Sequence, residues 1–493
     1  MSNNPSLKLQ TARTLKWNLI DRVASQVLYA VTGLVLAREL SQEAFGLVGA
    51  ILVFQAFASL MVDSGFSYAL LQRKDPSRED YSTVLWFNIG ISVILYVILF
   101  FCAPFIATIF GADERLIPLS RVMFLSFILN GAAIVQTNRF MKQMNARPIA
   151  VANTLGLTAG GVVGIWLAVA GYGAWAIVWQ SIILAFVKGL YLWIVSKWAP
   201  LFVFSLARLK SFFNIGGAMM FSSFLNTLFL NIYSFFIGNR VGLVALGYYT
   251  QSDKWSKMCV SSLSQILTSS FLPVLSNVQT EHDRFRRISS KMNRMTSYIV
   301  FPVFIGLIVA ATPIFHVLFG TKWDASIILF QLLLLRGIFT VFTSLYNNFL
   351  LSLGYASAIA KLEIWRDIVA IGALFATFPI MAVSLPENPV WGVSIMLWGQ
   401  VLAAIVAWAL TLVYVKQRGS LSIWSLIKDY VPYIILSLII GLMMYLIGKI
   451  FDSDWLALVI EIIIGGGIYL IVNYLVSSKI QADLFSFIKG KMF

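Results

Sequence analysis

The sequence predicts an all-α, multi-pass membrane protein, and three properties of the chain support that prediction. Its 493 residues are 59% hydrophobic and only 12% charged, and the mean hydropathy is +0.84. The apolar residues form long continuous runs, which excludes the alternating pattern of an outer-membrane β-barrel. No polar stretch is long enough to build a soluble domain. Such a chain buries its apolar surface in a bilayer as helices.

Fourteen apolar segments are long enough to span a membrane, because about 20 residues cross the hydrocarbon core. In chain order, the helices are expected at 15–37, 44–66, 81–108, 116–138, 149–171, 174–196, 213–238, 246–277, 295–319, 326–353, 358–383, 390–415, 429–450 and 455–477. The first and the eighth are the most polar. The loops are short, and none is large enough to form a catalytic domain outside the membrane.

The distribution of Lys and Arg predicts how these helices are oriented. If the loops alternate between the two sides, 24 of the 36 Lys and Arg residues lie in loops on the side of the N-terminus and 7 lie on the opposite side. Cytoplasmic loops are enriched in Lys and Arg. We therefore expect both termini in the cytoplasm and an even number of spans. The same bias explains the net charge of +15 without a nucleic-acid partner.

Several classes of functional site are missing from the sequence. Cys102 and Cys259 both lie in apolar segments, which speaks against a disulfide framework or a metal cluster. His282 and His316 are isolated, and two histidines are too few for a His-based metal site or triad. No Walker A sequence indicates an ATP site. We therefore expect no cofactor and no metal. The polar, basic N-terminus lacks a cleavable signal pattern, so the first helix is expected to be retained as the insertion signal.

A short internal repeat predicts two similar halves. The segments "VLARELSQEAFGLVGAI" and "FIGNRVGLVALGYYTQS" each join a polar turn to a helix that begins near a glycine. The spacing from Arg38 to Gly46 recurs from Asn239 to Gly247. Six helices separate the copies, as in transporters built from repeats with the substrate path between them. The expected parts are a six-helix lobe at 1–196, a cytoplasmic linker at 197–212, a second lobe at 213–415 and two additional helices with a cytoplasmic tail at 416–493.

The first helix carries a polar stripe within "WNLIDRVASQ". At helical spacing, one face of this helix presents Asn18, Arg22, Ser25, Gln26 and Tyr29. A charge at mid-bilayer costs roughly 2.5–3.5 kcal/mol, so such a stripe suits a wet cavity better than lipid. Arg22 and Gln26 are therefore candidate substrate ligands. Asp21 lies about 100° around the helix from Arg22, where it is a counter-charge, a contact to a neighbouring helix or an ion-coupling site.

The eighth helix is the other polar one. One of its faces is expected to present Lys257, Ser261, Ser264 and Thr268, with Lys254 and Gln265 beside it. Asp253 and Lys257 have the i,i+4 spacing of a helical ion pair. The segment is either a cavity wall with two lysines or a set of Ser and Thr side chains that join packed helices.

Other charged residues fall within expected helices, where they face a cavity, pair with each other or extend to the membrane interface. They are Arg121, Lys188, Arg336, Arg366, Asp63, Glu363, Asp367 and Glu461. Arg121 and Arg336 are expected in the outer halves of their helices, and Lys188 and Arg366 nearer the cytoplasm. Glu363 and Arg366 have the spacing of an i,i+3 ion pair. Glu461 lies outside the expected twelve-helix core and is not a candidate.

Six segments together resemble a known family of membrane transporters. They are "LARELSQEAFG" (36–46), "MVDSGFSYALLQRK" (61–74), "LWFNIG" (85–90), "APFIATIF" (103–110), "IVQTNRFMKQM" (134–144) and "GYGAWAIVWQ" (171–180). In order and spacing they resemble the polysaccharide flippases of the superfamily that also contains the multidrug and toxic-compound extruders. The most similar group is the colanic-acid and capsule-type lipopolysaccharide exporters. The similarity is strong over residues 10–200 and extends more weakly to about residue 420.

The resemblance implies two lobes around a central cavity in the bacterial cytoplasmic membrane. It implies transfer of undecaprenyl-diphosphate-linked oligosaccharide from the inner to the outer leaflet by alternating access, with a polysaccharide polymerase and glycosyltransferases as partners. Basic cavity residues of this family are thought to bind the diphosphate or acidic sugars. The matching positions are Arg22, Lys188, Lys254, Lys257 and Arg336, together with Arg121 and Arg366. Coupling to H⁺ or Na⁺ would use Asp21, Asp63 or Asp367.

Two other functions remain open at this point. A drug or cation extruder of the same superfamily would use carboxylates or aromatic residues as its main cavity groups. A membrane glycosyltransferase or polymerase would usually carry catalytic residues on a sizeable outside loop, and the short loops speak against it.

Overall fold

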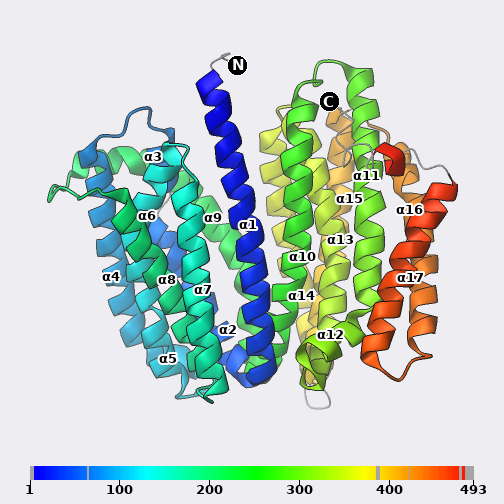
Figure 1. Cartoon of the computed structure of the whole chain (residues 1–493), viewed down its shortest axis with the longest axis horizontal. Coiled ribbons are helices and arrows are strands. Elements are labelled where there is room, and N and C mark those ends of the chain that lie inside the picture. The colour runs from blue at the N-terminus through cyan, green and yellow to red at the C-terminus, as the bar shows by residue number, and fades with distance from the viewer. Residues whose placement is uncertain (1–4, 64–65, 385–388, 420, 477–479, 484–493) are drawn as a thin grey trace. The chain divides into compact units, whose positions relative to one another are not determined.

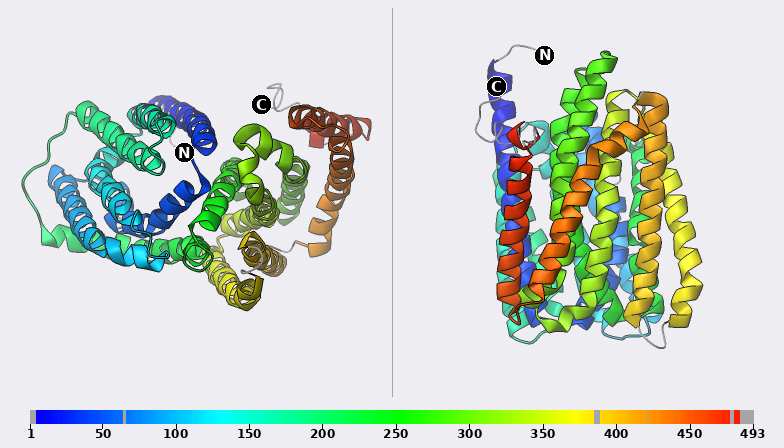
Figure 2. Two further views of the ribbon diagram at one scale, coloured as in Figure 1. Left: turned by 90° about the horizontal axis from the view of Figure 1, so that it is seen from below. Right: turned by 90° about the vertical axis from the view of Figure 1, so that its right-hand side faces the viewer.

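The computed structural model describes residues 5–63, 66–384, 389–419, 421–476 and 480–483. Every regular element in these ranges is a helix (Figure 1). The chain forms two compact units, Met1–Gly247 and Tyr248–Phe493. Within each unit, most helices are seen roughly end-on in the left view of Figure 2, so the helices of one unit run roughly parallel or antiparallel to each other.

In the described part of the first unit, the chain forms nine helices and the start of a tenth. They are α1 (Pro5–Glu39), α2 (Gln42–Asp63), α3 (Phe66–Gln72), α4 (Arg78–Ile109), α5 (Leu116–Met123), α6 (Leu125–Lys142), α7 (Arg147–Val169), α8 (Trp175–Ser196), α9 (Leu206–Arg240) and α10 (Leu243–Ser276). The second unit contains the rest of α10 and the remaining helices. These are α11 (His282–Val309), α12 (Ala311–Phe319), η1 (Thr321–Trp323), α13 (Asp324–Ser352), α14 (Ala356–Ser384), α15 (Pro389–Gly419), α16 (Ile423–Gly448) and α17 (Asp454–Leu475).

The helix lengths confirm a multi-pass membrane protein. Within the described residues, twelve candidate spans are long and apolar enough to cross a bilayer. The other two expected spans, 213–238 and 246–277, fall on α9 and α10, which have 35 and 34 residues. These two helices are long enough to cross but are not among the twelve, so the count of fourteen stays a prediction.

The prediction of one continuous helix at 295–319 is wrong. The structure ends α11 at Val309 and starts α12 at Ala311, and the ψ of 5° at Ala310 lies outside helical geometry. Pro313 has no N–H to bond to the carbonyl of Val309, so a continuous helix would lack that hydrogen bond. The expected helix at 116–138 is likewise divided at Phe124 into α5 and α6.

Glycines allow α7 to pack closely on α8. A Cβ atom at Gly156 would lie 2.8 Å from the carbonyl oxygen of Leu184, and one at Gly160 would lie 2.6 Å from that of Gln180. Small residues four positions apart permit such close packing between membrane helices. On another side of α7, Gly161 faces the methyl group of Thr32 of α1. The glycines of α7 thus hold α1, α7 and α8 together, and these three helices carry several of the predicted site residues.

The two copies of the internal repeat meet in the first unit. A Cβ atom at Gly46 of α2 would overlap the carbonyl oxygen of Leu243, and one at Gly247 of α10 would overlap that of Gln42. Gln42 and Leu243 occupy equivalent positions in the two copies, as do Gly46 and Gly247. The contact is therefore reciprocal, as expected where two similar segments pack about a pseudo-twofold axis. This contact supports the internal repeat, whereas the lobe boundaries at 197–212 and 415–416 stay predictions.

Hydrogen bonds and ion pairs around Asp80 join the first turn of α9 to the start of α4. Asp80 is fully buried and accepts hydrogen bonds from Arg208 Nη1 at 2.6 Å and from the Ser77 backbone N–H at 2.8 Å. Arg73 Nη1 lies 3.2 Å from the same carboxylate. The Ser77 side chain completes a capping box at the first turn of α4. Asp80 therefore both caps α4 and neutralises two arginines.

Asp80→Ala is expected to destabilise the protein by about 3 kcal/mol, because it removes the buried partner of two arginines and half of the capping box. The measurement is the thermal melting midpoint of the purified protein. Glu79→Gln is the matched control, since the Glu79 carboxylate also pairs with Arg208 but is about half exposed, and such pairs contribute little. Equal losses for both variants would contradict the assignment.

Candidate functional site

Asp21 of α1 faces α7. Its two carboxylate oxygens accept hydrogen bonds from Asn153 Nδ2 at 3.1 and 3.0 Å. Ser25, one turn further along α1, donates to the same carboxylate at 3.2 Å. Asp21 is half-buried, while Arg22 beside it is exposed. The adjacent acid and base thus point in different directions, as helical geometry predicts.

Lys188 of α8 supplies a positive charge near Asp21. The side chain is half-buried, and its ammonium group interacts electrostatically with the Asp21 carboxylate. Its Cβ packs on Gly156 of α7, where an added Cβ would lie 3.2 Å away. Asp21, Asn153 and Lys188 therefore form one polar cluster across α1, α7 and α8. Sequence reasoning missed Asn153, because an uncharged amide in an apolar segment gives no pattern signal.

Arg22 of α1 is available to a ligand. It is exposed in the first unit and has no hydrogen bond or ion pair with any other described residue. Gln26, one turn along, is half-buried, and Tyr29 after it is exposed. The predicted polar stripe therefore exists as a surface of the first unit, with Arg22 as its one cation.

Arg121 of α5 has structural contacts. Pro104 within α4 cannot donate to the carbonyl of Phe100, four residues earlier. Arg121 Nε donates to that carbonyl at 3.2 Å, and the guanidinium group lies 4.2 Å from the centroid of the Phe100 ring. Arg121 thus donates to the carbonyl that has no helical donor because of Pro104. These contacts favour a packing role between α4 and α5 over the predicted substrate role.

The second unit brings three helices together around Asp253. This α10 residue is buried, and its carboxylate lies 2.6 Å from Lys257 Nζ on the same helix, which confirms the i,i+4 pair. Arg336 Nη2 of α13 lies 3.9 Å from the other carboxylate oxygen, and Arg336 Nη1 donates to Gln400 Oε1 of α15 at 2.5 Å. Two bases share one acid here, so the cluster keeps one net positive charge. The lysine is exposed at its edge and available to a ligand.

The remaining predicted site residues make other contacts or lie outside the described side chains. Lys254 is half-buried, and its ammonium group lies 5.5 Å from the centroid of the Trp255 ring. Arg366 pairs with Asp367 at 2.8 Å, so the ion pair with Glu363 is not the one observed. The side chains of Asp63 and Thr268 lie outside the described part of the structure.

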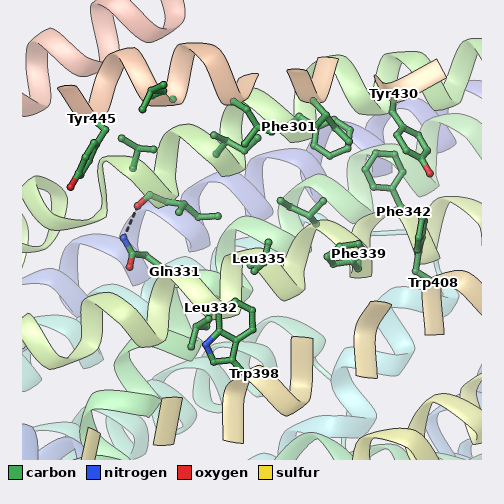
Figure 3. A pocket seen from close by; sticks show the side chains of 18 residues that line it. Phe301, Gln331, Leu332, Leu335, Phe339, Phe342, Trp398, Trp408, Tyr430 and Tyr445 are labelled. Atoms are coloured by element: carbon green, nitrogen blue, oxygen red, sulfur yellow. Dashed lines mark hydrogen bonds between the residues drawn. The ribbon is translucent and has the colours of Figure 1, made fainter. Parts of the chain in front are cut away.

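The second unit also contains a large apolar cavity of about 710 Å³ between α11, α13, α15 and α16 (Figure 3). Aromatic residues dominate the labelled part of its wall, among them Phe301, Phe339, Trp398 and Trp408. Gln331 also lines it and donates to the Ile308 carbonyl at 2.8 Å. A cavity of this kind suits a hydrocarbon chain. Sequence reasoning could not find it, because every apolar residue of a membrane helix gives the same signal.

Comparisons with known proteins agree with this architecture. Residues 35–328 match the polysaccharide biosynthesis protein family. The succinoglycan biosynthesis transport protein ExoT of Rhizobium meliloti is 29% identical over 393 residues, which cover 78% of each chain. The teichuronic acid biosynthesis protein TuaB of Bacillus subtilis is 30% identical over 369 residues, 71% of this chain and 73% of that one. The lipopolysaccharide biosynthesis protein WzxC of Escherichia coli is 24% identical over 378 residues, 75% of each.

Solved structures share the fold. The lipid II flippase MurJ in an inward closed conformation has a TM-score of 0.67 at 18% identity and covers 95% of this chain and 99% of its own. An inward-facing multidrug resistance MATE family transporter has a TM-score of 0.59 at 16% identity, over 82% of this chain and 99% of its own. The protein is thus a multi-pass membrane protein that shares its fold with these two solved structures. The family match and the TuaB identity further show that the chain belongs to the polysaccharide biosynthesis protein family.

Proposed function

We propose that the protein transports undecaprenyl-diphosphate-linked oligosaccharide from the inner to the outer leaflet of the bacterial cytoplasmic membrane. The supporting observation is membership of the polysaccharide biosynthesis protein family, whose similar members are named for succinoglycan, teichuronic acid and lipopolysaccharide. The transported oligosaccharide would be used in the synthesis of O-antigen, capsule or exopolysaccharide. The chain itself would transport and catalyse no bond change. A polymerase and glycosyltransferases would be its partners, and both termini would lie in the cytoplasm.

The described groups suit two parts of such a substrate, the diphosphate and the hydrocarbon tail. A diphosphate cannot cross hydrocarbon without compensating charge, because burying an unpaired ion is very costly. Each unit offers its own cations and hydrogen-bond donors for the diphosphate, Arg22 in the first and Lys257 with Arg336 in the second. The hydrocarbon tail would stay in the membrane or enter the apolar cavity of the second unit. Alternating access of two repeats would move the site from one side to the other.

The acidic residues are candidates for ion coupling in this proposal. Arg366 is paired with Asp367, and the positive charge of Lys188 lies near enough to Asp21 to interact with it electrostatically. A carboxylate that already has a cationic partner binds a coupling H⁺ or Na⁺ only when that partner withdraws. Asp21, Asp367 and Asp63 are therefore alternative candidates for the coupling site.

Reconstitution of the purified protein in liposomes tests the proposed function. We expect a fluorescent undecaprenyl-diphosphate-linked oligosaccharide to become accessible on the opposite leaflet, and a cationic dye to remain inside. Dye export without oligosaccharide flipping would favour a multidrug extruder. Lengthening of the oligosaccharide by the purified protein would favour a polymerase or a glycosyltransferase.

Arg22→Glu is expected to reduce flipping by at least about tenfold while the protein still folds, because an exposed charge with no described partner can be reversed without breaking a contact. The matched control is Lys449→Glu, which reverses an exposed base after the end of α16 and should have little effect. The flipping rate is measured at equal amounts of folded protein. Normal transport by Arg22→Glu would show that this residue is not a substrate ligand.

A further inference from the structure

A second pocket, of about 460 Å³, lies between α11, α16 and α17 and contains a buried carboxyl group. Glu461 of α17 lines this pocket and is only 4% exposed. Its Oε2 atom has no hydrogen-bond partner among the described residues. Most of the wall is apolar, including Pro302, Ile440 and Leu470. An ionisable side chain at such a place is costly and usually indicates function.

The pocket is elongated along α16. Gly448 is the last residue of α16, and a Cβ atom added there would overlap Glu461 Oε1. Glu461 therefore lies beside the end of α16. Ser437 also lines the pocket, eleven residues earlier on α16, which corresponds to about 16 Å of helix at 1.5 Å per residue. The pocket thus extends over about half of a hydrocarbon core that is about 30 Å thick.

The walls of the pocket are held in place. Pro302 within α11 leaves the carbonyl of Tyr298 without its helical donor, and the Tyr469 hydroxyl of α17 donates to that carbonyl at 2.9 Å. On the facing side, Gly465 permits close packing on Met444, whose Sδ would lie 2.5 Å from an added Cβ. These contacts join α17 to both α11 and α16. These contacts fix the relative positions of the three helices that form the pocket wall.

We propose that this pocket binds a lipid of the surrounding bilayer whose headgroup carries a primary ammonium, such as phosphatidylethanolamine. The ammonium group has three donors and pairs with the Glu461 carboxylate, which can only accept. The acyl chain lies against the apolar wall from Glu461 toward Ser437. The site thus complements the lipid: the carboxylate at one end pairs with the ammonium group, and the apolar wall along the rest contacts the acyl chain. Binding would join α17 to α11 and α16, and it does not depend on the proposed transport function.

The first experiment compares lipids. The full chain is purified in mixed micelles that contain phosphatidylethanolamine, phosphatidylcholine or phosphatidylglycerol with identical acyl chains. We expect phosphatidylethanolamine to raise the melting midpoint by about 3 °C or more over the other two, since a ligand that binds the native state stabilises it. Glu461→Gln should abolish this difference, because an amide keeps the shape but loses the charge. Equal stabilisation by all three lipids, or an unchanged preference in Glu461→Gln, would overturn the proposal.

A second pair of variants tests the place of binding without touching the carboxyl group. Gly466 lines the pocket, and a Cβ atom added there meets nothing within 4 Å, so Gly466→Leu adds an apolar side chain to the pocket wall at a position that has room for the Cβ atom. Gly467 is equally open but is not among the residues that line the pocket, which makes Gly467→Leu the matched control. We expect only Gly466→Leu to lose the preference for phosphatidylethanolamine. A preference retained in both variants would place the lipid elsewhere and overturn the proposal.

Discussion

Gly46→Ala and Gly247→Ala are each expected to destabilise the first unit by about 3 kcal/mol or more and to reduce the yield of folded protein sharply. In both cases the new methyl group would overlap a backbone carbonyl oxygen, that of Leu243 or of Gln42. Overpacking usually costs about 1–3 kcal/mol when side chains can move, and a carbonyl within a helix cannot rotate away. The measurements are the yield of monodisperse protein and its melting midpoint.

Two other helical glycines provide the controls. A Cβ atom at Gly90 of α4 or at Gly372 of α14 meets nothing within 4 Å. Alanine at these positions should be neutral or stabilising by up to about 1 kcal/mol, because alanine is the better helix former. If Gly46→Ala and Gly247→Ala behaved like these controls, the close crossing of α2 and α10 would be incorrect.

The reciprocal glycine contact also shows what sequence reasoning could and could not find. The equal spacing from Arg38 to Gly46 and from Asn239 to Gly247 was visible in the sequence, and it predicted two related segments. The sequence did not indicate that the two copies touch. Contact between residues about 200 positions apart depends on the tertiary path of the chain, whereas spacing is a local property.

The helices themselves were largely predictable because apolar length determines where a chain can cross a bilayer. The break at Ala310 was missed, since the residues on both sides are apolar and hydropathy does not detect a missing hydrogen bond. The contacts of Arg121 are not predictable from the sequence for a related reason. Its partner is the Phe100 carbonyl that Pro104 leaves unpaired, and a backbone acceptor has no signature in the sequence.

Within the site, local pairs were easier to predict than pairs between helices. The Asp253–Lys257 contact follows from i,i+4 spacing alone. The contact of Arg336 with Gln400 joins residues 64 positions apart and could not be derived from periodicity. The position of Glu461 after the expected core speaks against a site there, yet the structure buries its carboxyl group in a pocket. Burial depends on packing partners, so sequence position alone was a poor guide.

Substitution of Arg336 is expected to have the second large effect, on the rate of flipping. Arg336→Gln is expected to reduce flipping by about a hundredfold or more, because it removes the cation that two helices position next to Asp253 and leaves that cluster neutral. Arg336→Lys keeps the charge but loses the planar guanidinium group, which donates to Gln400 and approaches Asp253 at the same time. It should retain more transport than Arg336→Gln, within about tenfold of the wild-type protein. The flipping rate is measured in liposomes at equal amounts of folded protein.

The difference between these two variants separates a transport role from a structural one. If Arg336 only fixes α13 against α10 and α15, both variants lose the geometry of the guanidinium group, and both should lower the melting midpoint and transport to a similar extent. If its charge binds the substrate, Arg336→Lys restores transport although the hydrogen bond to Gln400 is altered. Lys361→Glu is the control for nonspecific effects of charge, because Lys361 is exposed near the start of α14. Equal transport by Arg336→Gln and Arg336→Lys would therefore exclude Arg336 as a charged ligand and leave Lys257 as the available base of the Asp253 cluster.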